Sequence, residues 1–342
     1  MNNLKVPVML KKNVRTNLHD LTEGMDAKEC YHPNAQWWGS HPFNELQGID
    51  SINGVWKSIR EALPDLERRD SIFVMGKNVP DDRVAFSMAG NLMVASLSHY
   101  QGTFRKPLCG IPANHKVVNL RSCEVHRLVE GKISHSYVLV DFLDLMNQVG
   151  LWPLVPSLGS EGLWPGPATS DGVRDDLESP SEDNKSIEVV LQMHHALHQF
   201  DGINIESMPM DEYWTPNFQY YAASGIGTSR GLTGFRCHHQ IPFLNAFPDR
   251  KGSGHYIRIS EGNFAVTGGW PSVEATHKGE WLGLPGTGKT IGMRVMDFYR
   301  LEDGKIAENW VPIDIIHALK QMGFDVFARL KHILGDPETN IR

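Results

Sequence analysis

The strongest constraint on the fold is an internal repeat. Residues 131–150 read GKISHSYVLVDFLDLMNQVG, and residues 304–323 read GKIAENWVPIDIIHALKQMG, at an offset of 304 − 131 = 173 residues. At this offset both copies open with Gly-Lys-Ile, and Asp141 matches Asp314. Two earlier segments, YHPNAQWW and YWTPNFQYY, repeat in the same order. Self-similarity in a fixed order indicates one module that has been duplicated.

The chain length and the segment between the copies agree with two domains. The 342 residues suffice for two domains of ordinary size. We predict a first module at 1–150, a linker at 151–185 rich in Pro, Gly, Ser and acidic residues, and a second module at 186–342. The acidic stretch 171–185 is expected to be unstructured. The first part of the linker is expected to lie along a domain surface through Trp152, Leu154, Leu158 and Trp164.

Each module is predicted to be α+β. Helical patterns cover residues 51–63 and 186–199, and β-branched and aromatic runs fill 71–140 and 255–310. The first of these strand regions includes SIFVMGKNV, VAFSMAGNLMVASLSHYQG and KVVNLRSCEVHRLVEGK. A short closing helix follows at 141–149. This order predicts a cone-shaped module, a curved and mostly antiparallel sheet wrapped round N-terminal helices, with a ligand pocket at its open end.

Composition excludes several classes of protein. The net charge of −7 and the absence of a basic block argue against nucleic-acid binding, and no apolar run approaches the roughly 20 residues that span a bilayer. The four cysteines, which form no Cys-x-x-Cys pair, predict reduced thiols and a cytoplasmic location. The expected partner is a small molecule. The two modules should form an internal pseudo-dimer, which could assemble further into a homo-oligomer.

Two motifs suggest ligands that the context disfavours. Residues 283–290, GLPGTGKT, match the phosphate-loop pattern, but no buried strand precedes them and no helix pattern follows, so a turn between strands is predicted. His194 and His198 have the i,i+4 spacing of metal ligands but lack an acidic or Cys partner at a ligand spacing, so no metal is predicted.

Asp141 and Asp314 each precede a helical stretch, and both copies have them. A carboxylate at that position accepts hydrogen bonds from free helix amides. We therefore favour an N-cap role over a catalytic one for both residues.

Strand parity supplies the catalytic candidates. In RVMDFYR, Asp297 shares a face with Val295 and Tyr299, whereas Met296 and Phe298 point the other way. A buried Asp needs a partner, and His277 or His239 would serve. Such a pair could be a general base or acid, or a satisfied structural pair, and spacing alone does not separate these.

Other polar and aromatic residues complete the predicted sites. Asn309, Trp214 and Trp270 are expected to contact substrate in the second module together with Tyr299. The first module has a different polar set, so the two pockets should not bind the same ligand equally. That set consists of His32, His41, Glu124 and His126, among Trp37, Trp38 and Trp56.

The segments HPN (32–34), THKG (276–279), GLPGTGK (283–289) and GKIAENWVPID…LKQMG resemble the SnoaL-like polyketide cyclases of the nuclear transport factor two-like superfamily. The resemblance spans roughly 14–150 and 186–325. It implies cofactor-free acid–base chemistry on a carbonyl compound, typically an aldol ring closure.

The resemblance also implies roles for individual positions. The family's pocket His falls on His277, and a second pocket His falls on Asp297. The family's catalytic Asp falls on Val311 and Val138, so a mechanism that uses that Asp cannot operate in either copy. We predict a cyclase-, isomerase- or lyase-type enzyme without cofactor, with Asp297, His277 and His239 as catalytic residues. The alternative is a binding module of the same fold for a small molecule or a protein.

Overall fold

The computed structural model of the chain describes residues 5–80, 88, 90–174 and 185–335. Part of the predicted strand run that starts at Val84 lies outside these residues, as does most of the acidic stretch of the linker. Within the described residues, no helix combines the length and the apolar character needed to cross a bilayer.

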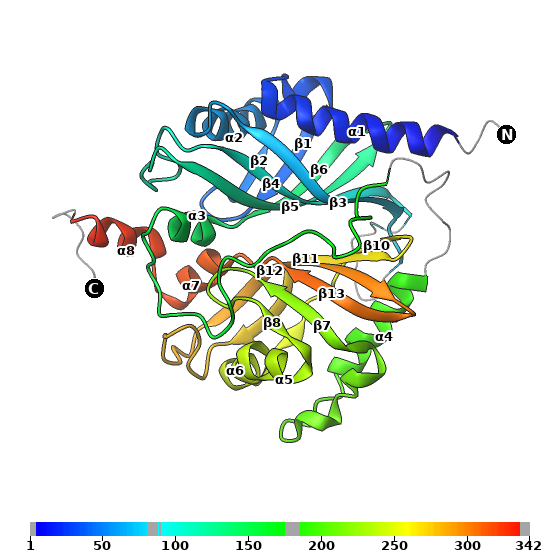
Figure 1. The fold of residues 1–342 in the computed structure, drawn as a ribbon, viewed down its shortest axis with the longest axis vertical. Helices are drawn as coiled ribbons and strands as arrows, with labels where there is room; N and C mark the ends of the chain where they lie inside the picture. Colours follow the sequence, from blue (N-terminus) through cyan, green and yellow to red (C-terminus); the bar gives the residue numbers. More distant parts are fainter. Residues whose placement is uncertain (1–4, 81–87, 89, 175–184, 336–342) are drawn as a thin grey trace.

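The first module begins with helices and continues as a sheet (Figure 1). Its helices are α1 (Lys5–Glu23), a 3-10 turn (Ala27–Glu29), α2 (Ile49–Ala62) and α3 (Phe142–Gln148). Its strands are β1 (Tyr31–Gly39), β2 (Glu45–Gln47), β3 (Glu67–Lys77), β4 (Leu92–Thr103), β5 (Val117–Val129) and β6 (Lys132–Val140). The predicted helix at 51–63 is confirmed as α2.

The second module repeats this plan with local changes. Its helices are α4 (Lys185–Leu197), α5 (Gly231–Phe235), α6 (Ile241–Ala246), α7 (Ile315–Met322) and α8 (Val326–Ile333), with 3-10 turns at Ile205–Ser207 and Met210–Glu212 and a π-helical turn at Arg236–Gln240. Its strands are β7 (Trp214–Ala222), β8 (Ser229–Arg230), β9 (Lys251–Gly252), β10 (Ile257–Glu261), β11 (Phe264–Thr276), β12 (Thr290–Glu302) and β13 (Lys305–Val311).

The two sheets share one topology. The strand orders are β2-β1-β6-β5-β4-β3 and β10-β11-β12-β13-β7-β8, with β9 paired to β11. The pairs β1–β6 and β7–β13 are parallel, and every other pair of named strands in the described chain is antiparallel. The structure thus confirms the predicted α+β class and the curved, mostly antiparallel sheets.

The sheets pack back to back, with most of the helices on the outer sides (Figure 1). Alternate residues of each strand point to opposite faces. Met296, Phe298 and Trp310 of the second sheet join an apolar core with Val125 and Leu139 of the first. The opposite faces hold a second set of apolar side chains, including Val295, Tyr299 and Val311, on the helix side of the sheet. The parity predicted for the strand around Asp297 is therefore confirmed.

The duplicated aspartates cap helices and also join the modules. Asp141 Oδ1 accepts a hydrogen bond from the Asp144 amide at 3.0 Å, and Asp314 Oδ1 accepts one from the His317 amide at 3.1 Å. The other oxygens reach across the interface, to the Ser224 amide at 3.0 Å from Asp141 and to the His41 amide at 2.9 Å from Asp314. The N-cap prediction is confirmed.

The described part of the linker lies against both modules. Trp164 is buried in the core between the sheets, beneath the Arg121 guanidinium at 5.1 Å from its ring centroid. Trp310 Nε1 donates a hydrogen bond to the Pro165 carbonyl at 2.8 Å. Val173 forms a parallel bridge with Phe73 of β3. We call residues 151–174 the strap.

The phosphate-loop match is a connection between strands. Residues 277–289 link β11 to β12, and Trp281 and Leu284 form a bridge within this link. Thr290 begins β12, so no helix N-terminus faces the glycines. The predicted turn is confirmed.

Candidate functional site

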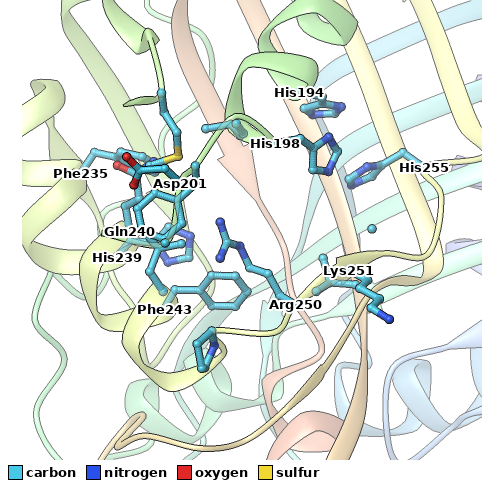
Figure 2. Close-up of a pocket in the computed structure, with 18 of the residues that line it drawn as sticks. His194, His198, Asp201, Phe235, His239, Gln240, Phe243, Arg250, Lys251 and His255 are labelled. Carbon is cyan, nitrogen blue, oxygen red and sulfur yellow. The ribbon is translucent and has the colours of Figure 1, made fainter. Parts of the chain in front are cut away.

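The second module contains a cavity of about 470 Å³, bounded by α4, by α5 and α6, and by the chain around β9 (Figure 2). Its volume suits a small organic molecule. The apolar part of the wall consists mainly of Leu197, Phe200, Phe235, Phe243 and Leu244. The ionisable part is mostly basic and consists of His194, His198, Asp201, His239, Arg250, Lys251 and His255.

Asp297 lies behind this wall. It is on β12, opposite Thr267 of β11, and its side chain is only 12% exposed. Its Oδ2 lies 3.7 Å from Nε2 of His255, which lines the cavity just before β10. This distance is within ion-pair range and longer than a hydrogen bond. A buried carboxyl group therefore stands next to an imidazole that a ligand can reach.

The pKa of Asp297 is raised from its ordinary value of 3.8 to about 7. Burial is the main cause, because it disfavours the charged form. The neighbouring polar side chains of Tyr299, Asn309 and Thr267 favour the carboxylate and offset part of this effect. A carboxyl group with this pKa can accept and release a proton near neutral pH.

Tyr299 and His194 continue the polar chain. The Tyr299 hydroxyl lies 3.0 Å from Nε2 of His194, which also lines the cavity. The His194 ring stacks on His255, with centroids 4.7 Å apart and planes at 25°. Burial and then the Asp297 charge raise the pKa of Tyr299 well above its ordinary value, so its hydroxyl stays protonated. The cluster of His194, His255, Asp297 and Tyr299 is called the acid–base cluster below.

His239 lines the cavity from the π-helical turn but does not join this cluster. Its ring stacks on Tyr220, with centroids 5.0 Å apart, and on Phe243 at 5.5 Å. Burial, and then the Asp297 charge, raise the pKa of Tyr220 well above its ordinary value. Burial lowers the pKa of His239 to about 4, and the imidazole is neutral at pH 7.

The structure does not bring His277 to Asp297. The His277 amide pairs with the Lys289 carbonyl, eight residues before Asp297 on the same strand run. At ~3.3 Å per residue, eight residues span ~26 Å. The buried His277 ring packs on Phe247, and its Nδ1 lies 3.2 Å from the Thr287 hydroxyl. Strand parity identifies the face of a side chain but not its position along the strand, which is why the predicted partner differs from the one observed.

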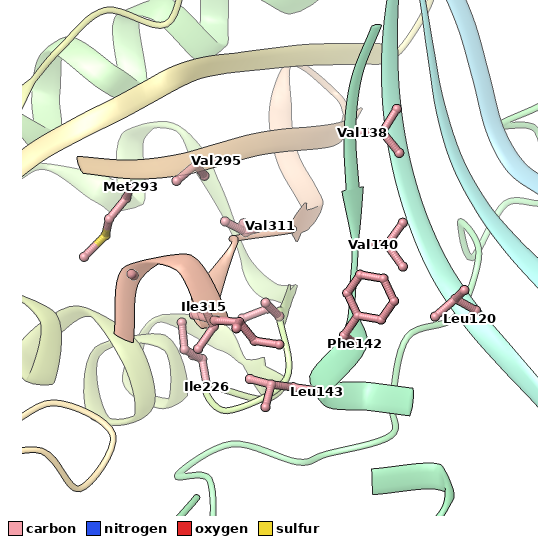
Figure 3. Close-up of a cluster of buried hydrophobic side chains, with 14 of the residues drawn as sticks. Leu120, Val138, Val140, Phe142, Leu143, Ile226, Met293, Val295, Val311 and Ile315 are labelled. Atoms are coloured by element: carbon pink, nitrogen blue, oxygen red, sulfur yellow. The ribbon is translucent and has the colours of Figure 1, made fainter. Parts of the chain in front are cut away.

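The positions that match the family's catalytic acid are apolar in both modules. Val311 and Val138 are buried within clusters of hydrophobic side chains (Figure 3). Asn309, two residues before Val311, is buried, and its Nδ2 donates to the Phe298 carbonyl at 3.1 Å. Asn309 thus lies beside Asp297 rather than on the cavity wall.

The two predicted tryptophans lie elsewhere. Trp214 packs on Phe218, with centroids 4.4 Å apart, and borders a separate hollow of about 430 Å³ at the start of β7. Trp270 lies between the modules, beneath the Arg294 guanidinium at 5.0 Å and 6.0 Å from the Tyr137 ring. Neither residue lines the cavity of the second module.

In the first module, Glu124 and His126 form a closed network. Both side chains are fully buried, and Glu124 accepts hydrogen bonds from Arg68 at 3.0 Å and contacts His126 at 3.0 Å. Burial alone would raise the pKa of Glu124, but Arg68, His126 and Tyr100 outweigh it and lower the pKa to about 2. His32 is partly buried on β1. Glu124 and His126, which were predicted to contact a ligand, thus belong to a set of buried groups that satisfy one another.

Sequence patterns missed two wall residues. Arg250 lies just before β9 and His255 just before β10, at the start of the strand region predicted for 255–310, and no alternation of polar and apolar residues marks either of them as a wall residue. His194 and His198, whose i,i+4 spacing was considered only for a metal, also line the cavity. Among the described residues, no group of three His, Cys, Asp or Glu side chains is arranged to hold a metal ion.

Comparison with known proteins defines the family. One similar solved structure is described as a SnoaL-like polyketide cyclase from Jannaschia sp. CCS1, with 16% identity over 41% of this chain and 92% of that one, at a TM-score of 0.32. A second is a SnoaL-like polyketide cyclase from Agrobacterium tumefaciens, with 15% identity over 44% of this chain and 100% of that one, at a TM-score of 0.30. A third is a hypothetical protein of ketosteroid isomerase-like fold from Catenulispora acidiphila, with 12% identity over 40% of this chain and 92% of that one, at a TM-score of 0.29. No curated protein matches the chain. The sequence profile of the SnoaL-like polyketide cyclases matches residues 14–149 and 195–322, most of both modules. The chain therefore belongs to the SnoaL-like polyketide cyclase family.

Proposed function

We propose that the protein is a cofactor-independent acid–base enzyme that acts on a small carbonyl-bearing or oxygenated metabolite in the cavity of the second module. The observation that carries this proposal is the His255–Asp297 pair, in which a carboxyl group with a pKa of about 7 backs an imidazole on the cavity wall. Buried titratable groups with shifted pKa values beside a cavity are typical of catalytic sites.

The cluster suggests a division of roles. His255 would remove a proton from the carbon next to a carbonyl group, and Asp297 would orient the imidazole and share the resulting charge. Tyr299, which stays protonated, would hold His194 in position as donor to the developing oxyanion. His239, neutral at pH 7, would orient the substrate through the aromatic wall.

Deuterium exchange tests this proposal without knowledge of the natural substrate. The wild-type protein should accelerate exchange of the α-hydrogens of 2-tetralone in D₂O, followed by proton NMR. His255→Gln and Asp297→Asn should each reduce the enzymatic rate by about 10²- to 10⁴-fold, the usual contribution of a general acid or base. His332→Gln, which changes an exposed histidine on α8, is the control and should leave the rate unchanged.

Two results would contradict the proposal. One is wild-type exchange that persists in both variants. The other is saturable binding of 2-tetralone without any exchange, which would identify a binding module instead.

A further inference from the structure

Arg250 differs from several other arginines that are withdrawn from solvent. Arg68 is paired with Glu124, Arg300 with Glu308, and Arg294 with Asp314. Arg250 is partly buried and lines the cavity, and its guanidinium stacks over the Phe200 ring at 5.5 Å from the centroid. Within the described part of the chain, it has no carboxylate partner.

Among the described residues, no counter-ion compensates the burial of Arg250. Burial lowers the pKa of Arg250, and no neighbouring charge or hydrogen bond offsets this effect. A guanidinium withdrawn from water without compensation gains most from an anion that binds beside it. In the view of Figure 2, its side chain extends into the space between His239 and Phe243 on one side and His198 and His255 on the other.

The remaining charges of the wall do not compensate Arg250. Asp201 is the acidic residue of the wall, and its Oδ1 already accepts the amides of Ile203 at 2.8 Å and Asn204 at 2.7 Å. Lys251, next in sequence, adds positive charge at the cavity. The other side of the wall is aromatic and aliphatic, which suits an apolar ligand body.

We propose that Arg250 is the binding residue for a carboxylate group on an otherwise apolar substrate. The planar guanidinium fits a carboxylate through two parallel hydrogen bonds, and its stacking on Phe200 fixes the plane in which they form. The Phe235–Phe243 wall takes the apolar body of the ligand. This assignment names a substrate class for the site proposed above and so rests on that proposed function.

Calorimetric titration of the full-length protein with 2-naphthoate and with 2-naphthamide measures how much the carboxylate contributes to binding affinity. The two probes share the ring system and differ in the charged group. Wild-type protein should bind 2-naphthoate at least about tenfold more tightly, as expected for a hydrogen bond to a charged group. Arg250→Met should remove this preference, whereas Lys331→Met, which removes an exposed cation on α8, should retain it within about threefold.

Further arms keep the proposal falsifiable. Arg250→Lys keeps the charge without the planar donor pair and should retain only part of the preference, and melting temperatures verify that each variant is folded. Wild-type protein that binds both probes equally or neither, or an Arg250→Met variant that keeps the preference, would overturn the proposal. Tenfold tighter binding of 2-naphthyl phosphate than of 2-naphthoate would overturn the carboxylate in favour of a phosphate. Exchange of 2-tetralone, which has no carboxylate, reports on the acid–base chemistry separately.

Discussion

The carboxyl group of Asp297 carries an energetic cost that several other buried acids of the chain avoid. Glu124 is paired with Arg68, Glu261 with Lys11, and Glu308 with Arg300. Asp297 has only His255 at ion-pair distance within the described residues. A protein keeps an unneutralised buried acid against this cost when the acid has a task that a satisfied group could not perform.

The cost predicts how stability depends on pH. The pKa of Asp297 is higher in the folded state, about 7, than its ordinary value of 3.8. Stability is therefore greatest below pH ~4 with respect to this group and is lost as the pH rises through ~7, by at most ~4 kcal/mol. Asp297→Asn should equal the wild type near pH ~4 and be more stable near pH ~8. Urea unfolding at both pH values measures the difference, and a variant that is less stable at pH ~8 would contradict the assigned pKa.

Single residues of the site were predictable to different degrees. Alternation along β12 correctly placed Asp297 and Tyr299 on the same face of the strand, because the period of a strand is fixed by its geometry. The partner of Asp297 comes from the chain just before β10, and this contact depends on how a loop folds over the sheet. No local periodicity encodes such a contact, so His255 and Arg250 were missed.

Among the elements, the closing helices α3 and α7 begin at aspartates that cap the helix and also contact the opposite module. Asp141 and Asp314 were predicted as N-caps because a carboxylate before an amphipathic stretch is a local signal. Their second contacts, to the Ser224 and His41 amides of the opposite module, are tertiary and were not predictable. The repeated Asp thus links the start of each closing helix to the neighbouring module.

Substitution of two aspartates separates the contribution of helix capping to stability from that of the contact between the modules. Asp325 caps α8 through the amides of Phe327 and Ala328 at 3.0 Å and is exposed, so Asp325→Ala should cost ~1 kcal/mol. Asp314→Ala also removes the acceptor of the His41 amide and the partner of Arg294 at 3.2 Å, and should cost ~3 kcal/mol or more. Free energies of unfolding from denaturant titration test the order. Equal costs would mean that the contact across the interface contributes nothing.

At the scale of the whole molecule, duplication produced two modules, each a sheet curved into a cup, whose interiors hold different side chains. The repeat predicted both modules and their common topology, because every element that builds the sheet occurs in each copy. It did not predict that the first cup would hold a closed ionic network while the second holds a cavity. That difference arises from side chains at equivalent positions, Glu124 and Asp297, and from the different charges that neighbouring strands bring to them.

The back-to-back sheets predict the behaviour of a separated module. We propose residue 186 as the start of the second module. Residues 186–342 alone would expose the apolar face that contains Val266, Met296, Phe298 and Trp310. We expect this fragment to self-associate, as measured by light scattering after size-exclusion chromatography, and Phe298→Glu in the fragment to reduce the association. A fragment that stays monomeric at all concentrations would show that the interface is dispensable.

The strap gives the pairing of the two cups a property that two separate chains could not have. Subunits of a dimer part when their concentration falls well below the dissociation constant. Here Trp164 and Pro165 contact the sheets while the chain itself keeps the halves within reach, so the encounter is intramolecular. Dilution therefore does not separate the second sheet from the first. The fraction of molecules in which the two modules are packed together is the same in a cell with few copies as in one with many.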